Sequence, residues 1–197
     1  MFIGFGTTTG LLSALFMVSI LLISCAPDLA ERVRAYETTY NTHDAEKLMS
    51  FYADDVIFEI VGVWVKHGKQ VVRDLAEWDK ATNMRMTISN ISVCGDTVTC
   101  KLVETNDWWK LAGMGEVHYE PCVMIFRKGL ISEMRAKMVG SSVEAYRKVW
   151  PAIYEWASEN RGKELAELLP DGEFIYGAEP ARKWLDLLRE WRASQTQ

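Results

Sequence analysis

The first 27 residues of the chain contain no charged side chain. The chain as a whole has no run of lysine or arginine of the kind that follows a phosphate backbone, and its 27 acidic residues outnumber its 22 basic ones, for a formal net charge of −5. These absences argue against nucleic acid as a partner. There is also no internal repeat or low-complexity segment, so the sequence after residue 25 favours one domain with its own hydrophobic core.

The four cysteines form no CxxC pair, and none has a histidine at metal-ligand spacing. The sequence therefore predicts neither a metal site nor a cofactor. Cys94, Cys100 and Cys122 are interpreted as small apolar residues on strands. In an oxidising compartment Cys100 and Cys122 are the favoured pair, because a hairpin through residues 108–115 would place them across from each other.

An apolar run over residues 11–23 closes with Leu-Ile-Ser-Cys at positions 22–25. An apolar stretch of about 7 to 15 residues followed by small residues is typical of a cleavable export signal. The box resembles that of bacterial lipoproteins, which implies lipidation of Cys25 and an envelope protein anchored to a membrane on its extracytoplasmic face. The alternative is a single uncleaved transmembrane helix, since residues 1–24 have about the ~20-residue length that spans a bilayer.

After residue 28, apolar residues recur at helical spacing in some stretches and alternate with polar residues, as in strands, in others. Helices are predicted over residues 28–41, 44–52 and 71–78. Strands are predicted over residues 56–60, 63–65, 84–88, 98–102, 117–126 and 131–138, with residues 108–115 as a loop. This order predicts an α+β fold, in which a cone-shaped, curved antiparallel sheet wraps on helices.

Residues 141–197 add a helical extension. Ser141 and Glu144 have the spacing of a capping box, and Pro180 suits the first position of the last helix. The extension carries four tryptophans: Trp150, Trp156, Trp184 and Trp191. Each buried aromatic ring contributes roughly 2 kcal/mol by area. We therefore expect the extension to dock on the core or on a second subunit, in which case the protein is a homodimer.

Five segments carry a family resemblance: Tyr36, Asn41 to Asp44, Phe51-Tyr52-Ala53-Asp54-Asp55, Gly68-Lys69, and Phe126 through Gly129 to Ile131. With them, the chain resembles the nuclear transport factor 2-like superfamily, particularly its SnoaL-like and ketosteroid-isomerase-like branches. The resulting division is a signal (1–25), a SnoaL-like domain (26–140) and the extension (141–197). The resemblance implies a conical pocket between the sheet and the first and third helices, but the fold alone does not name a reaction.

The resemblance places Tyr36 where ketosteroid isomerases keep a tyrosine that donates to the developing oxyanion. It places Ile60 where they keep the aspartate base, and Tyr119 near their second donor. An isoleucine cannot accept a proton, and general base catalysis needs a titratable group within about 3 Å of the proton. Isomerase activity is therefore disfavoured.

Three other acid or base residues are expected near the pocket mouth: Glu104, His118 and Glu120. Glu104 shares the strand face of the inward residues that precede it, whereas His118 and Glu120 lie on the face opposite Tyr119 if the strand is regular. They are weak catalytic candidates, because solvated strand ends are the commoner explanation for such residues.

Twelve side chains are predicted to line the pocket: Tyr36, Tyr40, Phe58, Ile60, Met86, Val98, Cys100, Leu102, Tyr119, Met134, Ala136 and Met138. Such a pocket is apolar, with tyrosine hydroxyls as polar points. The sequence favours a membrane-anchored protein that binds a small apolar ligand or a protein partner without catalysis. One alternative is a SnoaL-like hydrolase or cyclase acting on an apolar substrate. The other is a structural oligomerisation subunit with a filled pocket.

Overall fold

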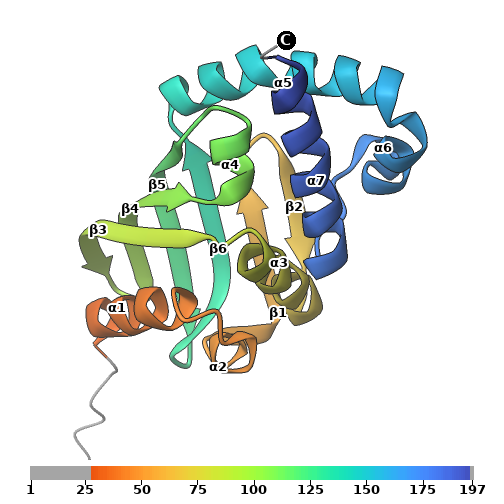
Figure 1. Cartoon of the computed structure of the whole chain (residues 1–197). Coiled ribbons are helices and arrows are strands. Elements are labelled where there is room, and N and C mark those ends of the chain that lie inside the picture. Colours follow the sequence, from red (N-terminus) through yellow and green to blue (C-terminus); the bar gives the residue numbers. More distant parts are fainter. Residues whose placement is uncertain (1–27, 196–197) are drawn as a thin grey trace, which may run out of the picture.

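The structure is a computed structural model that describes residues 28–195 (Figure 1). The helices are α1 (Leu29–Tyr40), α2 (Ala45–Met49), α3 (Lys69–Ala81), α4 (Asp107–Leu111), α5 (Gly140–Asn160), α6 (Gly162–Leu168) and α7 (Ala178–Ser194). The strands are β1 (Tyr52–Ile60), β2 (Trp64–His67), β3 (Arg85–Cys94), β4 (Thr97–Thr105), β5 (Glu116–Arg127) and β6 (Leu130–Met138). The predicted signal and Cys25 lie outside the described residues. Among the helices described, none is both long and apolar enough to cross a bilayer.

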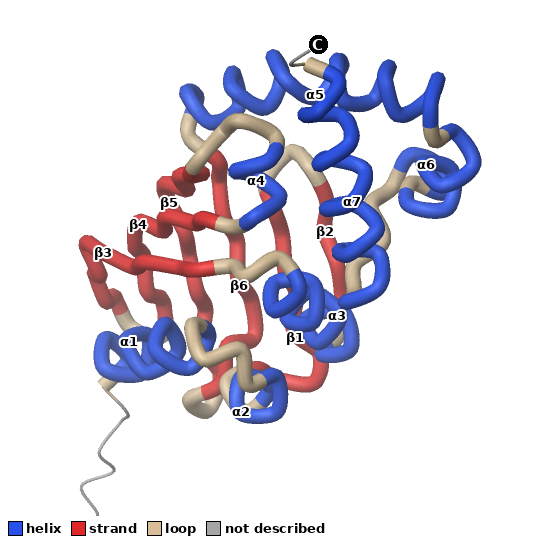
Figure 2. The backbone as a smooth tube through the Cα atoms, in the orientation of Figure 1, coloured by secondary structure: helices blue, strands red, loops and turns tan. Residues whose placement is uncertain are grey.

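The six strands form one curved sheet in the order β2-β1-β6-β5-β4-β3 (Figure 2). The α+β class is confirmed, but the sheet is mixed rather than antiparallel, because β1 runs parallel to β6. Local hairpins make the other pairs antiparallel. The β1–β6 pair instead joins the first and the last strand in chain order, so no hairpin sets its direction.

Helices α1 and α3 cover one face of the sheet (Figure 1), α1 against β3 and α3 against β1. The side chain of Asp28 caps α1 by accepting a hydrogen bond from the backbone N–H of Ala30 at 2.9 Å, as expected for an N-cap residue. Buried residues from α1, α2, α3 and the sheet make one apolar cluster, which we name the first core. Tyr36, Val56 and Met124 are among its members.

Four local predictions are wrong. Pro180 is not the first residue of the last helix, because α7 begins at Ala178. Residues 108–115 are not a loop: Asn106 accepts the backbone N–H of Trp109 at 2.7 Å and thereby starts the short helix α4. The second helix ends at Met49, and Tyr52 already begins β1. Ser141 does not cap α5, which begins at Gly140 without a side-chain cap.

The extension packs on the rest of the same chain through α7, which contacts α3 and α4. The result is a second apolar cluster, named here the second core, that joins Trp78 of α3 and Trp108 of α4 to the buried faces of α5, α6 and α7. Trp184 is completely buried in it. The buried tryptophan ring attaches the last helix to the part of the chain that precedes the extension.

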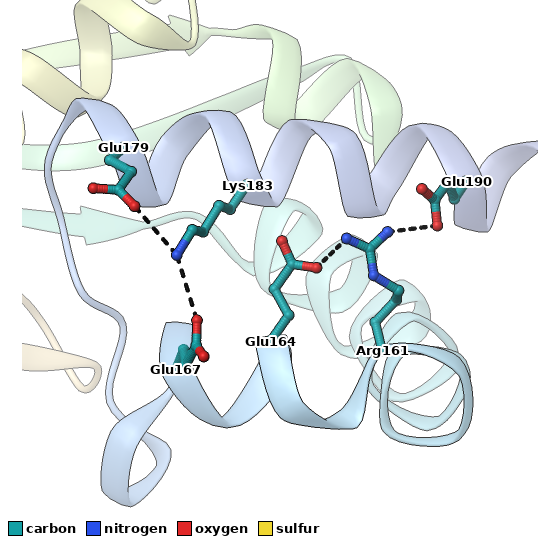
Figure 3. Close-up of polar contacts among 6 residues, drawn as sticks. All are labelled: Arg161, Glu164, Glu167, Glu179, Lys183 and Glu190. Atoms are coloured by element: carbon teal, nitrogen blue, oxygen red, sulfur yellow. Dashed lines mark hydrogen bonds and ion pairs between the residues drawn. The ribbon is translucent and has the colours of Figure 1, made fainter.

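Ion pairs fix α6 against α7 (Figure 3). Arg161 pairs with Glu164 and Glu190, and Lys183 pairs with Glu167 and Glu179. Exposed pairs of this kind contribute only about 0 to 1 kcal/mol each. Their main effect is to set how α6 lies on α7, and so where the segment between these helices runs.

Candidate functional site

Tyr36 lies in the first core, where its hydroxyl is 2.6 Å from the hydroxyl of Tyr52 and 3.9 Å from the sulfur of Met134. Burial is the main cause that raises the pKa of Tyr36 well above its ordinary value. The two hydroxyls satisfy each other, so Tyr36 has a protein partner at the position where the resemblance implied an oxyanion donor. Ile60 is half-buried at the end of β1.

The twelve residues predicted to line a pocket all belong to the first core or pack directly against it. Eight are buried, and the half-buried ones are Tyr40, Phe58, Ile60 and Met138. A hollow of about 520 Å³ is lined by none of the twelve residues, and a cavity of about 10 Å³ is lined by Tyr40 but by none of the other eleven. The structure therefore places these side chains in a packed core rather than around an open space.

Glu104, at the end of β4, is held by three hydrogen-bond donors. One carboxylate oxygen accepts from Trp109 Nε1 and Asn106 Nδ2, each at 2.9 Å, and the other accepts from the Tyr119 hydroxyl at 3.1 Å. The donors are close because α4 begins directly after β4 and turns Asn106 and Trp109 back over the strand end. Burial raises the pKa of Glu104, and the three hydrogen bonds partly offset that rise.

Asp79 is a buried carboxyl group on α3 that the sequence analysis did not select. Only 9% of its surface is exposed, and its carboxylate accepts a short hydrogen bond from the Tyr40 hydroxyl. Burial, followed by the charge of Glu104, raises the pKa of Asp79 well above its ordinary value. We call Asp79 and Glu104 the acidic pair.

The members of the acidic pair have different environments. Glu104 has three donors that stabilise its negative charge. Asp79 has one donor and is disfavoured as an anion by the charge of Glu104. Two neighbouring carboxyl groups whose pKa values are pushed apart can serve as an acid and a base at the same pH. Burial raises the pKa of both carboxyl groups, and that of Asp79 lies well above its ordinary value, so Asp79 is the better candidate for the acid and Glu104 for the base.

Tyr176 brings the extension to this region. Its hydroxyl accepts a hydrogen bond from Trp64 Nε1 at 3.0 Å, and its ring lies 5.4 Å from that of Trp78. Burial raises its pKa, and the charges of Asp79 and Glu104 add to the rise. Tyr176, from outside residues 28–140, is therefore near enough to the acidic pair to respond to its charges.

The structure does not bring His118 or Glu120 to the site. His118 Nε2 lies 2.8 Å from Glu116 Oε1, and Glu120 pairs with Lys101 at 2.8 Å near the protein surface. Both lie on the opposite face of β5 from Tyr119, as strand alternation predicted. Of the three weak catalytic candidates, only Glu104 is joined to other functional groups.

Cys100 and Cys122 are directly opposite each other on β4 and β5. Both are buried free thiols. The hydrogen bond between the thiols lowers the pKa of Cys100 and raises that of Cys122. No group of three or more histidine, cysteine or acidic side chains within residues 28–195 is arranged to hold a metal ion.

Sequence reasoning also missed Tyr52, Asn106, Trp109 and Tyr176 as contributors. Asp79 did leave a signal in the sequence. It lies seven residues after Val72, four after Leu75 and three after Ala76, all buried on α3, so it occupies the apolar stripe of its own helix. An acidic residue in that stripe is expected to be either paired or functional.

Comparisons with known proteins agree with this fold. A family model described as a SnoaL-like domain matches residues 33–134. SalBIII, an epoxide hydrolase/cyclase-like enzyme with a role in pyran ring formation in the polyether salinomycin, is 18% identical, with 57% of this chain and 92% of that chain covered and a TM-score of 0.51. An LEH-like epoxide hydrolase of M. tuberculosis is 14% identical, with 63% and 92% covered and a TM-score of 0.50. No curated protein matches the sequence.

At these identities the likeness to solved structures shows the fold alone. Together with the family match, it confirms the prediction of a SnoaL-like domain of the nuclear transport factor 2-like superfamily. The same fold carries different chemistries, so the reaction has to be argued from the side chains at the site.

Proposed function

Because the chain belongs to the SnoaL-like domain family, we propose that it is an acid–base enzyme of the hydrolase or cyclase type, acting on an apolar substrate. The acidic pair carries this proposal. The sequence favoured non-catalytic binding because Ile60 replaces a base, but Asp79 and Glu104 supply titratable groups from other elements. In this proposal Glu104 is the general base and Asp79 the general acid.

The reaction class that fits the pair is the opening of an epoxide, the ring named for both similar enzymes. Glu104 takes a proton from water as the water oxygen bonds to a ring carbon. The carbon–oxygen bond of the ring breaks, and Asp79 donates its proton to the ring oxygen, which gives a neutral diol. Proton return from Glu104 to Asp79 restores the pair. If a hydroxyl of the substrate replaces water, the product is a cyclic ether.

The surroundings of the pair select an apolar substrate. Tyr119, which donates to Glu104, has Leu102 opposite it on one side and Met138 on the other. Ile60 and Phe58 are half-buried on β1, the strand that pairs with the β6 strand of Met138. Apolar walls with a few placed polar groups are typical of small-molecule sites, and they strengthen the electrostatic effect of each carboxyl group.

The test is a turnover screen with apolar epoxides, with esters and β,γ-unsaturated ketones as other substrate classes. Glu104→Gln and Asp79→Asn should each lower kcat/KM by about 10² to 10⁴-fold, the contribution of a positioned general acid or base. Glu120→Gln and Glu77→Gln remove carboxylates from the same strand pair and the same helix and should leave kcat/KM unchanged.

The pH profile sharpens this test. Activity requires an ionised Glu104 and a protonated Asp79, so kcat/KM should be bell-shaped in pH. Wild-type turnover that survives both substitutions would exclude the acidic pair as the catalytic groups.

The packed first core favours a second candidate, a non-catalytic ligand-binding or structural protein. Its test is a binding titration with hydrophobic carbonyl compounds run beside the turnover screen. Binding without turnover would favour the ligand-binding protein. Neither binding nor turnover would favour the structural subunit.

We also propose that a lipid on Cys25 holds the domain at the extracytoplasmic face of a membrane. The Leu-Ile-Ser-Cys box supports this. Expressed in a bacterial host, the wild-type chain should incorporate radioactive fatty acid, and Cys25→Ser should not. Unlabelled wild-type protein with an intact N-terminus would favour the transmembrane helix instead.

A further inference from the structure

A groove of about 520 Å³ lies between α3, β2 and the segment of residues 170–176 that follows α6. Apolar side chains from both sides form much of it: Val71 of α3 faces Phe174, Ile175 and Tyr176 of the segment. Ile175 is 39% exposed. The volume lies within the range of about 300 to 1,000 Å³ that is typical of small-molecule sites.

The charges of the groove are strongly unequal. Asp74, Asp171 and Glu173 lie along it, and Lys66 is its one cation. Neither Asp171 nor Glu173 has a cationic partner within the described residues. An anionic ligand would meet three carboxylates, whereas a cation would gain favourable interactions with them.

The aromatic wall is also suited to a cation. The Lys66 ammonium group lies 5.6 Å from the centre of the Tyr176 ring and 5.8 Å from that of Trp64. These are distances at which an ammonium ion is attracted to the face of an aromatic ring. Lys66 therefore already occupies these ring faces, and the ammonium group of a ligand would have to lie nearer the three carboxylates, which outnumber this lysine.

The segment that forms the wall is held in place. Phe174 stacks on Trp184 with ring centres 5.1 Å apart, and the ion pairs of Lys183 and Arg161 fix the preceding helix on α7 (Figure 3). A wall that is ordered before binding loses less entropy when a ligand arrives.

We infer that this groove binds an organic ammonium ion with an apolar body, and that it forms the outer part of the substrate site. The second half of this inference rests on the proposed function. Tyr176 is the link between the two parts: it lines the groove, and its hydroxyl, which accepts a hydrogen bond from Trp64 Nε1, is near enough to Asp79 and Glu104 for their charges to raise its pKa, after burial as the main cause. The substrate class is then an apolar epoxide that carries an amine.

The experiment compares three probes with one phenylbutyl body: 4-phenylbutylamine, 4-phenylbutanol and 4-phenylbutyrate. Calorimetric titration of the full chain should show the amine binding about tenfold more tightly than the alcohol, with the carboxylate weakest. Asp171→Asn with Glu173→Gln should weaken amine binding about tenfold and leave the alcohol unchanged. Glu155→Gln with Glu159→Gln removes the same charge from exposed positions on α5 and should have no effect.

The Glu104→Gln variant separates this inference from the proposed function. This variant should bind the amine as the wild type does, because Glu104 is not one of the residues that line the groove. In the wild type, amine binding without turnover of any epoxide would overturn the proposed function and keep the groove as a binding site. Equal binding of the three probes, or amine binding unchanged by Asp171→Asn with Glu173→Gln, would overturn the groove. Equal turnover of amine-bearing and neutral epoxides would overturn its assignment to the substrate.

Discussion

The first core and the second core both bury large aromatic rings, but they treat the polar atoms of these rings differently. In the first core each buried phenol has a partner: Tyr36 with Tyr52, Tyr40 with Asp79, and Tyr119 with Glu104. In the second core the buried indole N–H groups of Trp108, Trp184 and Trp191 have none.

This difference separates two ways of holding aromatic side chains. Directed hydrogen bonds fix where a hydroxyl or carboxyl group lies, and a buried network of them specifies one geometry. A buried donor without a partner costs about 1 to 3 kcal/mol, which the second core offsets by apolar area alone. A catalytic site needs polar groups at fixed positions, whereas the attachment of one segment to another needs only buried apolar area. The catalytic candidates accordingly lie in the first region and the attachment of the extension in the second.

Removal of the second core should have the largest effect. A chain ending after Gly140 would expose Trp78 and Trp108 together with the face of α3 that α7 covers. An apolar patch of that size is rarely tolerated by soluble monomers, so the fragment should aggregate or lose several kcal/mol of stability. Size-exclusion chromatography and thermal unfolding measure this. A monomeric fragment as stable as the full domain would contradict the argument.

Trp184→Ala should have the next largest effect. The ring is completely buried and has no polar partner to lose, so the cost is that of a cavity, about 3 to 5 kcal/mol. Urea unfolding at pH 7 measures it. Tyr154→Ala, at a side chain that is 50% exposed on α5, is the control and should change the free energy of unfolding by less than about 1 kcal/mol. Similar losses for both variants would mean that the second core is not tightly packed.

Tyr36→Phe probes the hydrogen bonds of the first core. The substitution preserves the ring but leaves the buried Tyr52 hydroxyl without its partner at 2.6 Å. The expected loss of stability is about 1 to 3 kcal/mol. Tyr154→Phe removes an exposed hydroxyl and should be neutral. If Tyr36→Phe lowers the free energy of unfolding no more than Tyr154→Phe does, the hydrogen bond between Tyr36 and Tyr52 does not contribute measurably to stability.

Asp79 should produce the smallest but most diagnostic effect, which is on pH dependence. Its pKa is raised in the folded protein, so the folded state binds the proton more tightly than the unfolded state. This contribution to stability is complete below the unfolded pKa of about 3.9 and is lost as the pH rises through the raised folded pKa.

The wild-type protein should therefore lose up to about 1.4 kcal/mol of stability per pH unit from Asp79 as the pH rises above about 4. Asp79→Asn keeps an oxygen that can accept from Tyr40 but cannot ionise, so its decline should be shallower. Urea unfolding at a series of pH values provides the comparison, with Glu77→Gln on the same helix as the control. Parallel curves would show that Asp79 is not held protonated.

The sequence predicted the fold well because its signals are local. The apolar stripe of α3 and the alternation in β4 each follow from a single stretch of chain. The parallel β1–β6 pair was missed because it depends on two strands far apart in the chain. The short helix α4 was missed because residues 108–115 were predicted to be a loop and Asn106 was not recognised as a helix cap.

The site was only partly predictable for the same reason. Glu104 was placed on an inward face by strand alternation, and Tyr119 by strand alternation together with the family resemblance. Their partner Asp79 lies on α3 and Tyr176 in the extension, and only the folded chain shows that these residues converge. Tyr36 was assigned through family resemblance, which could not show that Tyr52 would be its partner.

The hydrogen bond from Trp64 to Tyr176 joins residues 112 positions apart, and this separation has a consequence for the order of folding. Contacts between distant residues form late, because the entropy of closing the loop is lost before they can form. The β3–β6 meander can assemble from successive hairpins, whereas α7 reaches Trp78 only afterwards. Trp184→Ala should then act mainly on the unfolding rate, leaving the folding rate nearly unchanged. During the interval the uncovered tryptophans of α3 and α4 would be open to chaperones or to other folding chains.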